Sequence, residues 1–251
     1  MVGEVDSTMI FSIYTGISGM RVNADRIRVT ANNIANVNTP GFRSGRAVIQ
    51  SSASGGAKTA AVQRSSLQGA AIFTANPFNI AIEGAGFFRL TTTDGRTGYS
   101  RLGNFSTDNQ GRLADPAGNV LIPGITIPAD AQSISIGRDG RVTATLNGQS
   151  GQIGQKTLLG IIETARFNNP SGLIAGDGGV FFESAPSGAP ITGAPGSGGR
   201  GALMPGSIES SNVDLTKEIV DLIITKHAYA ANAKTVKTAD ELLGIALDIK
   251  T

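Results

Sequence analysis

The period of the hydrophobic pattern changes along the chain and divides it into helical ends and a β-rich middle. Between residues 10 and 34, apolar and small side chains recur at alternating spacings of three and four. Such a heptad stripe is typical of a helix packed against another helix. Its positions are Ile10, Ile13, Ile17, Met20, Ala24, Ile27, Ala31 and Ile34. We therefore predict a long N-terminal helix.

A looser heptad occupies the C-terminal end of the chain. Its positions are Leu215, Leu222, Tyr229, Val236 and Leu243. Ser211, with Asp214 three residues later, or Asn212 is the expected N-cap. Both helices carry further apolar residues outside these stripes, and a two-helix hairpin buries only one stripe per helix. The remaining apolar faces must pack on the central domain or on other copies of the chain.

An asparagine-rich run is expected to end the N-terminal helix. Asn is a poor helix former that tolerates left-handed φ at helix ends, and Pro40-Gly41 suits the central positions of a type II turn. We predict that this turn sets the direction in which the chain leaves the helix. Its residues are Asn32, Asn33, Asn36, Pro40, Gly41 and Phe42. The Ser-, Ala-, Gly- and Gln-rich stretch that follows predicts an extended or poorly structured connector.

Between residues 79 and 184 the period shortens toward two, which predicts an all-β domain. The expected strands are 79–83, 87–92, 98–105, 119–122, 125–127, 133–136, 141–146, 158–164 and 180–183. Turn pairs separate them, namely Asp94-Gly95, Asp139-Gly140, Asn147-Gly148 and Asp177-Gly178. A Gly- and Pro-rich segment, 186–201, predicts an exposed return loop.

The predicted fold class is α+β, with the two terminal helices pairing as a coiled coil around the β-rich domain. The helical domain comprises 1–42 and 210–251, the connector 43–76, and the β-rich outer domain with its return loop 77–209. Because the helices bracket the β domain, both termini are expected at one end.

Composition excludes most catalytic chemistry. The chain has 251 residues with no Cys, which removes disulfides, iron–sulfur clusters and thiolate zinc sites. Its single histidine, His227, cannot supply a multi-histidine metal site, and no nucleophile motif accompanies it. We expect no cofactor and no metal. The 21 basic and 19 acidic side chains nearly cancel, which gives no support to nucleic-acid binding. No apolar run is long enough to enter a membrane, and residues 1–17 lack the apolar core of a secretory signal peptide.

Scattered carboxylates leave one enzymatic alternative open. Paired acids carry out glycoside hydrolysis, so a secreted β-rich carbohydrate-binding protein or hydrolase is conceivable. The candidates are Glu83, Asp94, Asp108 and Asp115, although Asp94 and Asp108 are better explained as turn formers. An adhesin whose helical ends trimerise is a further alternative.

Four motifs give the chain a resemblance to a known family. They are ANNIANVNTPGFR (31–43), IEGAGFF (82–88), YSRLGNFSTD followed by GRL (99–108 and 111–113), and SSNVDL (210–215). In this order they resemble the bacterial flagellar rod and hook proteins, the axial structural proteins of the basal body. IPADAQSISIGRDG (127–140) is similar to distal-rod members, whereas SNVDLTKEI (211–219) and NAKTVKT (232–238) are similar to hook proteins.

The resemblance implies a non-enzymatic structural subunit of the distal-rod type, with a short hook protein or a proximal rod protein as alternatives. It implies terminal helices that form the coiled-coil inner layer of a helical tube in the periplasm-spanning rod, which transmits torque in motility. Its expected partners are copies of itself, neighbouring rod and hook proteins, and the flagellar type III export apparatus, which needs no cleaved signal. The inner-layer contacts are assigned to Ile13, Ile17, Met20, Ile27 and Ile34 with Leu215, Leu222, Tyr229, Val236 and Leu243.

Overall fold

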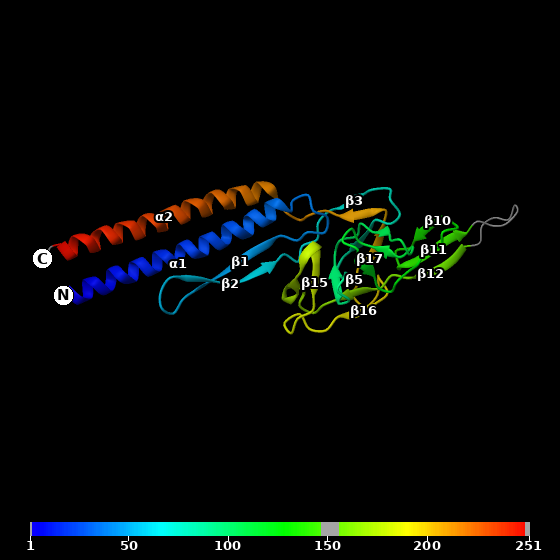
Figure 1. Cartoon of the computed structure of the whole chain (residues 1–251), viewed down its shortest axis with the longest axis horizontal. Helices are drawn as coiled ribbons and strands as arrows, with labels where there is room; N and C mark the ends of the chain where they lie inside the picture. Colours follow the sequence, from blue (N-terminus) through cyan, green and yellow to red (C-terminus); the bar gives the residue numbers. More distant parts are fainter. Residues whose placement is uncertain (1, 147–155, 249–251) are drawn as a thin grey trace. The chain divides into compact units, whose positions relative to one another are not determined.

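The computed structural model describes residues 2–146 and 156–248, which divide into two compact units (Figure 1). Unit 1 comprises Met1–Val37, Ser44–Ser65 and Val213–Thr251, and unit 2 comprises Asn38–Arg43 and Ser66–Asn212. The chain therefore passes between the units at 37–38, 43–44, 65–66 and 212–213. The ends of the predicted helical domain, at 1 and 249–251, and the predicted turn Asn147-Gly148 lie outside the described residues.

Unit 1 is built on two long helices, α1 (Val2–Ala35) and α2 (Leu215–Asp248), which confirm the predicted helical ends of an α+β fold. They run antiparallel, because Gly16 lies against Val236 whereas Asn33 contacts Glu218. The N-terminal end of α1 and the C-terminal end of α2 consequently lie at the same end of this unit (Figure 1).

The N-cap of α2 differs from the predicted one. The Asp214 Oδ1 atom accepts hydrogen bonds from the N–H groups of Thr216 at 3.0 Å and Lys217 at 3.2 Å, so Asp214 is the cap. Ser211 and Asn212 precede the helix and belong to unit 2, where the Asn212 N–H donates to the Phe42 carbonyl.

Within the segment expected to be an extended or poorly structured connector, residues 45–64 form a β-hairpin in unit 1. Strands β1 (Gly45–Ser51) and β2 (Ala57–Arg64) pair antiparallel and lie along α1. The Ala57 N–H donates to the Ser18 hydroxyl at 3.1 Å, and Gly45 packs against Val29. Most side chains of the hairpin are exposed or half-buried, so cross-strand pairing and contact with α1, rather than hydrophobic alternation, hold these strands.

Unit 2 contains the remaining strands and confirms the β-rich middle. In chain order they are β3 (Ala71–Phe73), β4 (Ile80–Glu83), β5 (Phe87–Thr91), β6 (Thr97–Ser100), β7 (Ser106–Thr107), β8 (Leu113–Ala114), β9 (Val120–Leu121), β10 (Ala131–Ile136), β11 (Arg141–Leu146), β12 (Lys156–Ile161), β13 (Thr164–Arg166), β14 (Ile174–Ala175), β15 (Val180–Phe182), β16 (Ile191–Gly193), β17 (Ala202–Pro205) and β18 (Ser207–Glu209). Two short 3-10 turns, Pro170–Gly172 and Asp177–Gly179, flank β14.

These strands form one large antiparallel sheet and three smaller ones. The large sheet has the order β14-β15-β6-β5-β9-β8-β7, with β13 joining β5 to β16. Strands β10, β11 and β12 form a second sheet, and β17 pairs with β4 and β18 with β3. The main core contains Ile80, Ile82, Phe88, Leu90, Phe105, Leu113, Leu121, Ile125, Ile136, Val142, Ile162, Val180 and Leu203.

Three predicted strands differ from the structure. The strand expected over 158–164 is interrupted at 162–163, between β12 and β13. The strand expected over 98–105 ends at Ser100, because Gly103 packs directly against the carbonyl of Ile80, where a side chain would not fit. Residues 125–127 form no strand and contribute only an isolated bridge at Thr126.

The predicted exposed loop 186–201 also contains structure. Strand β16 pairs with β13, and Pro195 is buried beside Gly140. The short strands β7, β8, β14 and β16 have too few residues for an alternating pattern to mark them.

Candidate functional site

Small and polar residues lie at several close contacts between α1 and α2. On α1 the buried positions include Gly16, Val22, Asn23, Thr30 and Asn33. A Cβ atom on Gly16 would lie 2.6 Å from Val236 Cγ2, and one on Gly19 would lie 2.7 Å from Asn232 Oδ1. The two helices therefore approach closely where neither glycine carries a side chain. On α2 the buried positions are Thr225 and Ala239.

Asn33 joins three elements of unit 1. Its Nδ2 group donates to the Gly45 carbonyl and to Glu218 Oε1, both at 2.9 Å, while its Oδ1 atom accepts the Gly45 N–H at 2.8 Å. An amide side chain carries its donor and its acceptor on separate atoms, so it can bond both backbone groups of one residue. Asn33 is 1% exposed. It therefore links the end of α1 to the start of β1 and to α2.

Glu218 is the acidic partner in this contact. Partial burial raises the pKa of its carboxyl above the ordinary value, hydrogen bonds from Asn33 and Thr30 oppose the rise, and the charge of Asp221 adds to it. The helix pair thus holds a carboxylate whose charged form is disfavoured.

The asparagine-rich run ends α1 without a left-handed asparagine among the described residues, and a tight turn at Pro40-Gly41 follows it. In unit 1, Asn36 Nδ2 donates to the Asn32 carbonyl at 2.8 Å and so satisfies a carbonyl at the end of α1. In unit 2, Gly41 has φ +65°, and the Phe42 N–H donates to the Thr39 carbonyl at 3.2 Å. Glycine at this position with that hydrogen bond is the arrangement expected of a type II turn.

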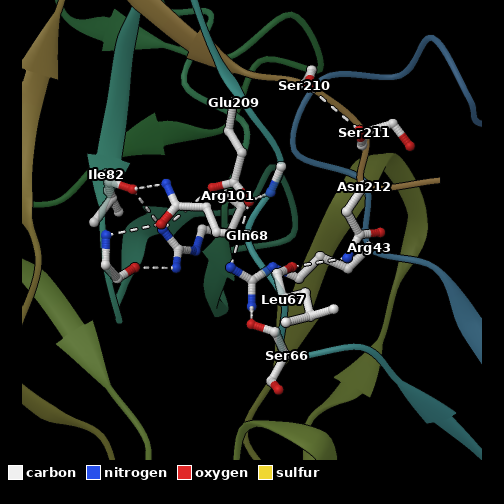
Figure 2. Close-up of polar contacts among 12 residues, drawn as sticks. Arg43, Ser66, Leu67, Gln68, Ile82, Arg101, Glu209, Ser210, Ser211 and Asn212 are labelled. Atoms are coloured by element: carbon white, nitrogen blue, oxygen red, sulfur yellow. Dashed lines mark hydrogen bonds and ion pairs between the residues drawn. The ribbon is translucent and has the colours of Figure 1, made fainter. Parts of the chain in front are cut away.

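A buried ionic cluster lies directly after this turn. Arg43 Nη2 is 3.4 Å from Glu209 Oε1, and Arg101 Nη1 is 3.3 Å from Glu209 Oε2 (Figure 2). Glu209 is 1% exposed, and both arginines are buried. Glu209 ends β18, and Arg101 follows β6. We name Arg43, Arg101 and Glu209 the ionic cluster.

Backbone groups surround the ionic cluster and satisfy part of its hydrogen-bonding capacity, whereas Arg101 Nε and Glu209 Oε2 are buried without a hydrogen-bond partner. Arg43 Nη1 donates to the Ser66 carbonyl at 3.1 Å, and Arg101 donates to the carbonyls of Ile82 and Gly84 (Figure 2). The Gly69 N–H donates to Glu209 Oε1 at 3.2 Å. These contacts let a buried site with two positive charges and one negative charge persist, because carbonyl oxygens stabilise the excess positive charge.

Burial lowers the pKa of Arg101 to about 10. The negative charge of Glu209 raises this pKa, whereas the positive charge of Arg43 lowers it further. The Arg101 guanidinium also lies 5.6 Å from the centre of the Phe87 ring, within the range of a cation–π contact. Glu209 is therefore the counter-ion that both arginines require.

Three of the four sequence motifs contribute residues to this place in unit 2, and the fourth adjoins it. Arg43 closes the first motif, Ile82 and Gly84 belong to the second, Arg101 to the third, and Glu209 immediately precedes the fourth. Sequence reasoning missed Arg101 and Glu209 as a pair, since they lie 108 positions apart and neither stands in a charge pattern. The signal that points to this pair is that the first and third motifs each contain a charged residue of the cluster and the fourth motif directly follows one.

None of the ten predicted inter-helix residues is fully buried. Ile13, Ile17, Met20, Ile27 and Ile34 on α1 and Leu222, Val236 and Leu243 on α2 are half-buried, whereas Leu215 and Tyr229 are exposed. Their assignment to an inner layer stays a prediction.

The candidate carboxylates have structural partners. Asp94 and Asp108 sit in turns, where they bond Arg96 and Arg112, and this confirms them as turn formers. Glu83 pairs with Arg138 at 2.6 Å, and the buried Asp115 bonds Asn119. His227 is exposed on α2.

Over residues 2–146 and 156–248, no group of three or more His, Cys, Asp or Glu side chains is placed to hold a metal ion. Within the same ranges, neither long helix is apolar enough over its length to cross a membrane.

Family models match both ends and the middle of the chain. They describe a flagella basal body rod protein (residues 13–43), the D1 domain of the flagellar hook protein FlgE/F/G (residues 81–144) and the C-terminal part of the flagellar basal body rod FlgEFG protein (residues 204–249). The first and last matches cover much of α1 and α2. The second runs from β4 to β11 and leaves out only the first residue of β4 and the last two of β11.

Whole-length relatives agree with these matches. The chain is 37% identical to the flagellar basal-body rod protein FlgG of Caulobacter vibrioides, over 92% of this chain and 96% of the relative. It is also 37% identical to FlgG of Bacillus subtilis, over 96% of this chain and all of the relative. The flagellar hook protein FlgE of Salmonella typhimurium is 36% identical over only 49% of this chain and 29% of its own length.

Similarity over nearly the full length favours the rod over the hook, and it does not favour a carbohydrate-binding protein, a hydrolase or an adhesin. The family is structural and not enzymatic. The chain belongs to the family of flagellar basal-body rod proteins, as a structural subunit of the rod.

Proposed function

We propose that this chain is a distal-rod subunit that polymerises with copies of itself into a helical tube and transmits torque. In this proposal α1 and α2 form a coiled-coil inner layer, the β-rich unit forms the outer layer, and rod and hook proteins are the neighbours along the axis. The FlgG names of the full-length relatives support this position.

One observation carries the self-assembly part. The helix pair has glycine, threonine and asparagine among its buried residues and leaves many large apolar side chains exposed. The exposed ones are Ile10, Phe11 and Tyr14 on α1 and Leu215, Ile219, Val220, Ile223, Ile224, Tyr229, Leu242 and Ile245 on α2. So many exposed apolar residues on two neighbouring helices indicate a protein partner. A repeated head-to-tail contact that does not close into a ring gives an open helical polymer.

The inner-layer residues of this proposal remain the ten of the two heptads. Tyr229 is the best test position among them, because its side chain is exposed on α2 and leaves surface for a partner. An aspartate at this position places a charge on the apolar face without opening a cavity in the helix pair.

The test compares Tyr229→Asp with Tyr229→Phe in cells that lack the native subunit. We expect the Asp variant to keep its helical circular dichroism when purified, to be absent from isolated basal bodies and to abolish swimming. The Phe variant should incorporate and restore swimming. Normal incorporation of the Asp variant would show that this face does not assemble.

Export belongs to the same proposal. The subunit leaves the cytoplasm through the flagellar export apparatus without loss of an N-terminal segment, and it is located in the periplasm-spanning rod. Mass spectrometry of subunits from purified basal bodies tests this directly, since a cleaved signal would shorten the N-terminal peptide.

A further inference from the structure

Three segments of unit 2 lie next to the points where the chain passes between the units, and the ionic cluster touches all of them. They are 38–43, 66–69 and 209–212, and we name them the connecting segments. Each is irregular apart from Glu209 at the end of β18, so no sheet holds them over their length. Their geometry depends on specific polar contacts.

Glu209 is the residue at which these contacts converge. Its backbone carbonyl accepts the Gly41 N–H at 2.7 Å, its Oε1 atom accepts the Gly69 N–H and faces Arg43, and its Oε2 atom faces Arg101. One residue therefore contacts the turn, the segment after β2 and the arginine of the third motif.

The arginines extend the contact to the sheet. Arg101 is bound to the carbonyls of Ile82 and Gly84 at the end of β4, and Gln68 bridges the same place by donating to the Ile82 carbonyl and accepting the Gly84 N–H. The connecting segments are thus fastened to β4, whose residues Ile80 and Ile82 belong to the main core.

We propose that Glu209 is a positioning residue, which through Arg43 and Arg101 fastens all three connecting segments to the β-rich unit before any contact with another subunit. The turn at 39–42 then has its final geometry in the isolated chain. This inference goes beyond the proposed function and does not depend on it, because its test needs only the purified full-length protein.

Removal of the Glu209 charge and removal of the Arg43 charge are expected to have different effects on the ionic cluster. Without the Glu209 carboxylate, two buried arginines lose the acidic side chain that pairs with both of them, whereas the loss of Arg43 leaves Arg101 and Glu209 as a neutral pair. Breaking a buried pair so that a charge is uncompensated is the more costly change. Glu209→Gln should therefore disturb the connecting segments more than Arg43→Gln.

The experiment is amide hydrogen exchange on the full-length chain, followed by mass spectrometry of peptides covering 38–43, 66–70 and, as an internal reference, β5. In Glu209→Gln we expect exchange in the first two to rise at least about tenfold while β5 is unchanged, because local opening exposes only the amides it frees. The matched control is Glu163→Gln, which removes a carboxylate paired with Arg89 at 2.7 Å on the partly exposed surface of the same unit. It should change neither segment.

Unchanged protection in 38–43 and 66–70 in Glu209→Gln would overturn the proposal. If this variant loses protection everywhere, Arg43→Gln decides, since its neutral Arg101–Glu209 pair keeps the unit folded. If amide exchange in Arg43→Gln rises only in 38–43 and 66–70, and Arg43→Lys partly reverses the rise, the positioning role is supported. If exchange in these two segments does not rise in Arg43→Gln, the positioning role is rejected.

Discussion

Asn33 and Glu218 meet across the helix pair of unit 1 through a hydrogen bond of 2.9 Å between residues 185 positions apart. The bond places a partly buried carboxylate opposite a buried amide. Since this contact is polar, it fixes which residues of α1 and α2 lie opposite each other more than it contributes to burial of apolar surface.

Glu218→Gln is expected to stabilise unit 1 at neutral pH. The folded-state pKa of Glu218 is raised, so the folded protein binds the proton more tightly than the unfolded chain and the wild type gains stability as the pH falls through that pKa. Glutamine keeps the acceptor for Asn33 without the cost of burying a charge. Thermal unfolding followed by circular dichroism should show a higher midpoint for the variant at pH 8 and a smaller difference at pH 4.

The control for this prediction is Glu241→Gln on the same helix, where the carboxylate is exposed and 3.7 Å from Lys237. It should change the midpoint little at either pH. A Glu218→Gln variant that is less stable than the wild type at pH 8 would contradict the role assigned to this carboxyl.

Asn33→Asp tests the three-way contact. The substitution keeps the shape but removes the Nδ2 donor to Gly45 and Glu218 and places a second carboxylate beside Glu218. We expect the free energy of unfolding to fall by about 2 kcal/mol or more, since a buried acceptor loses its partner. Asn32→Asp, at an exposed position one residue away, should cost much less in the same urea titration. Equal effects of the two substitutions would argue against the contact.

Glycine-to-alanine substitutions in the two helices should have opposite signs. Gly244 has nothing within 4 Å of its added Cβ, so Gly244→Ala should stabilise the helix by up to about 1 kcal/mol through propensity alone. Gly19→Ala should destabilise it, because the new methyl group displaces the Asn232 amide from its bond to the Ala228 carbonyl. Adding Asn232→Ala to Gly19→Ala should recover much of the loss. Stabilisation by Gly19→Ala alone would show that the helices have room to separate there.

The turn glycine Gly41 offers a matched pair with Gly95. Both have positive φ, of +65° and +82°, so alanine is strained at either position. A Cβ on Gly41 would also lie 2.8 Å from the backbone of Arg101, whereas nothing lies within 4 Å at Gly95. Gly95→Ala should cost about 1 kcal/mol from backbone strain, and Gly41→Ala clearly more. Equal losses in a chemical denaturation series would indicate that the turn shifts freely.

The features predictable from sequence are those encoded within a few neighbouring residues. Both helices, the turn at Pro40-Gly41 and most strands with large alternating side chains, such as β5 and β11, follow from local pattern and residue preference. The strands of the β1–β2 hairpin show no such alternation of large side chains. They are held by pairing with each other and by contact with α1, which a local sequence pattern does not reveal. A heptad count selected the isoleucine stripe and did not mark Gly16 and Gly19, where the helices leave no room for an added Cβ atom.

The ionic cluster could not be found by pattern for a different reason. Its members come from positions 43, 101 and 209, and only the fold brings them together. The family resemblance identified the motifs that contain or adjoin them. It did not show that the motifs meet in one place, which is a property of the tertiary structure.

The order of segments in unit 1 also dictates an order of folding events. The 34 residues of α1 come first in the chain and the 34 residues of α2 come near its end, with all of the β strands between them. The early helix can be joined by the neighbouring hairpin soon after synthesis or translocation. It has to wait for its helical partner until almost the whole polypeptide has been delivered, and closure over so long a loop is slow. In the proposed assembly, the apolar helix faces are therefore completed last, and self-association waits until the subunit is whole.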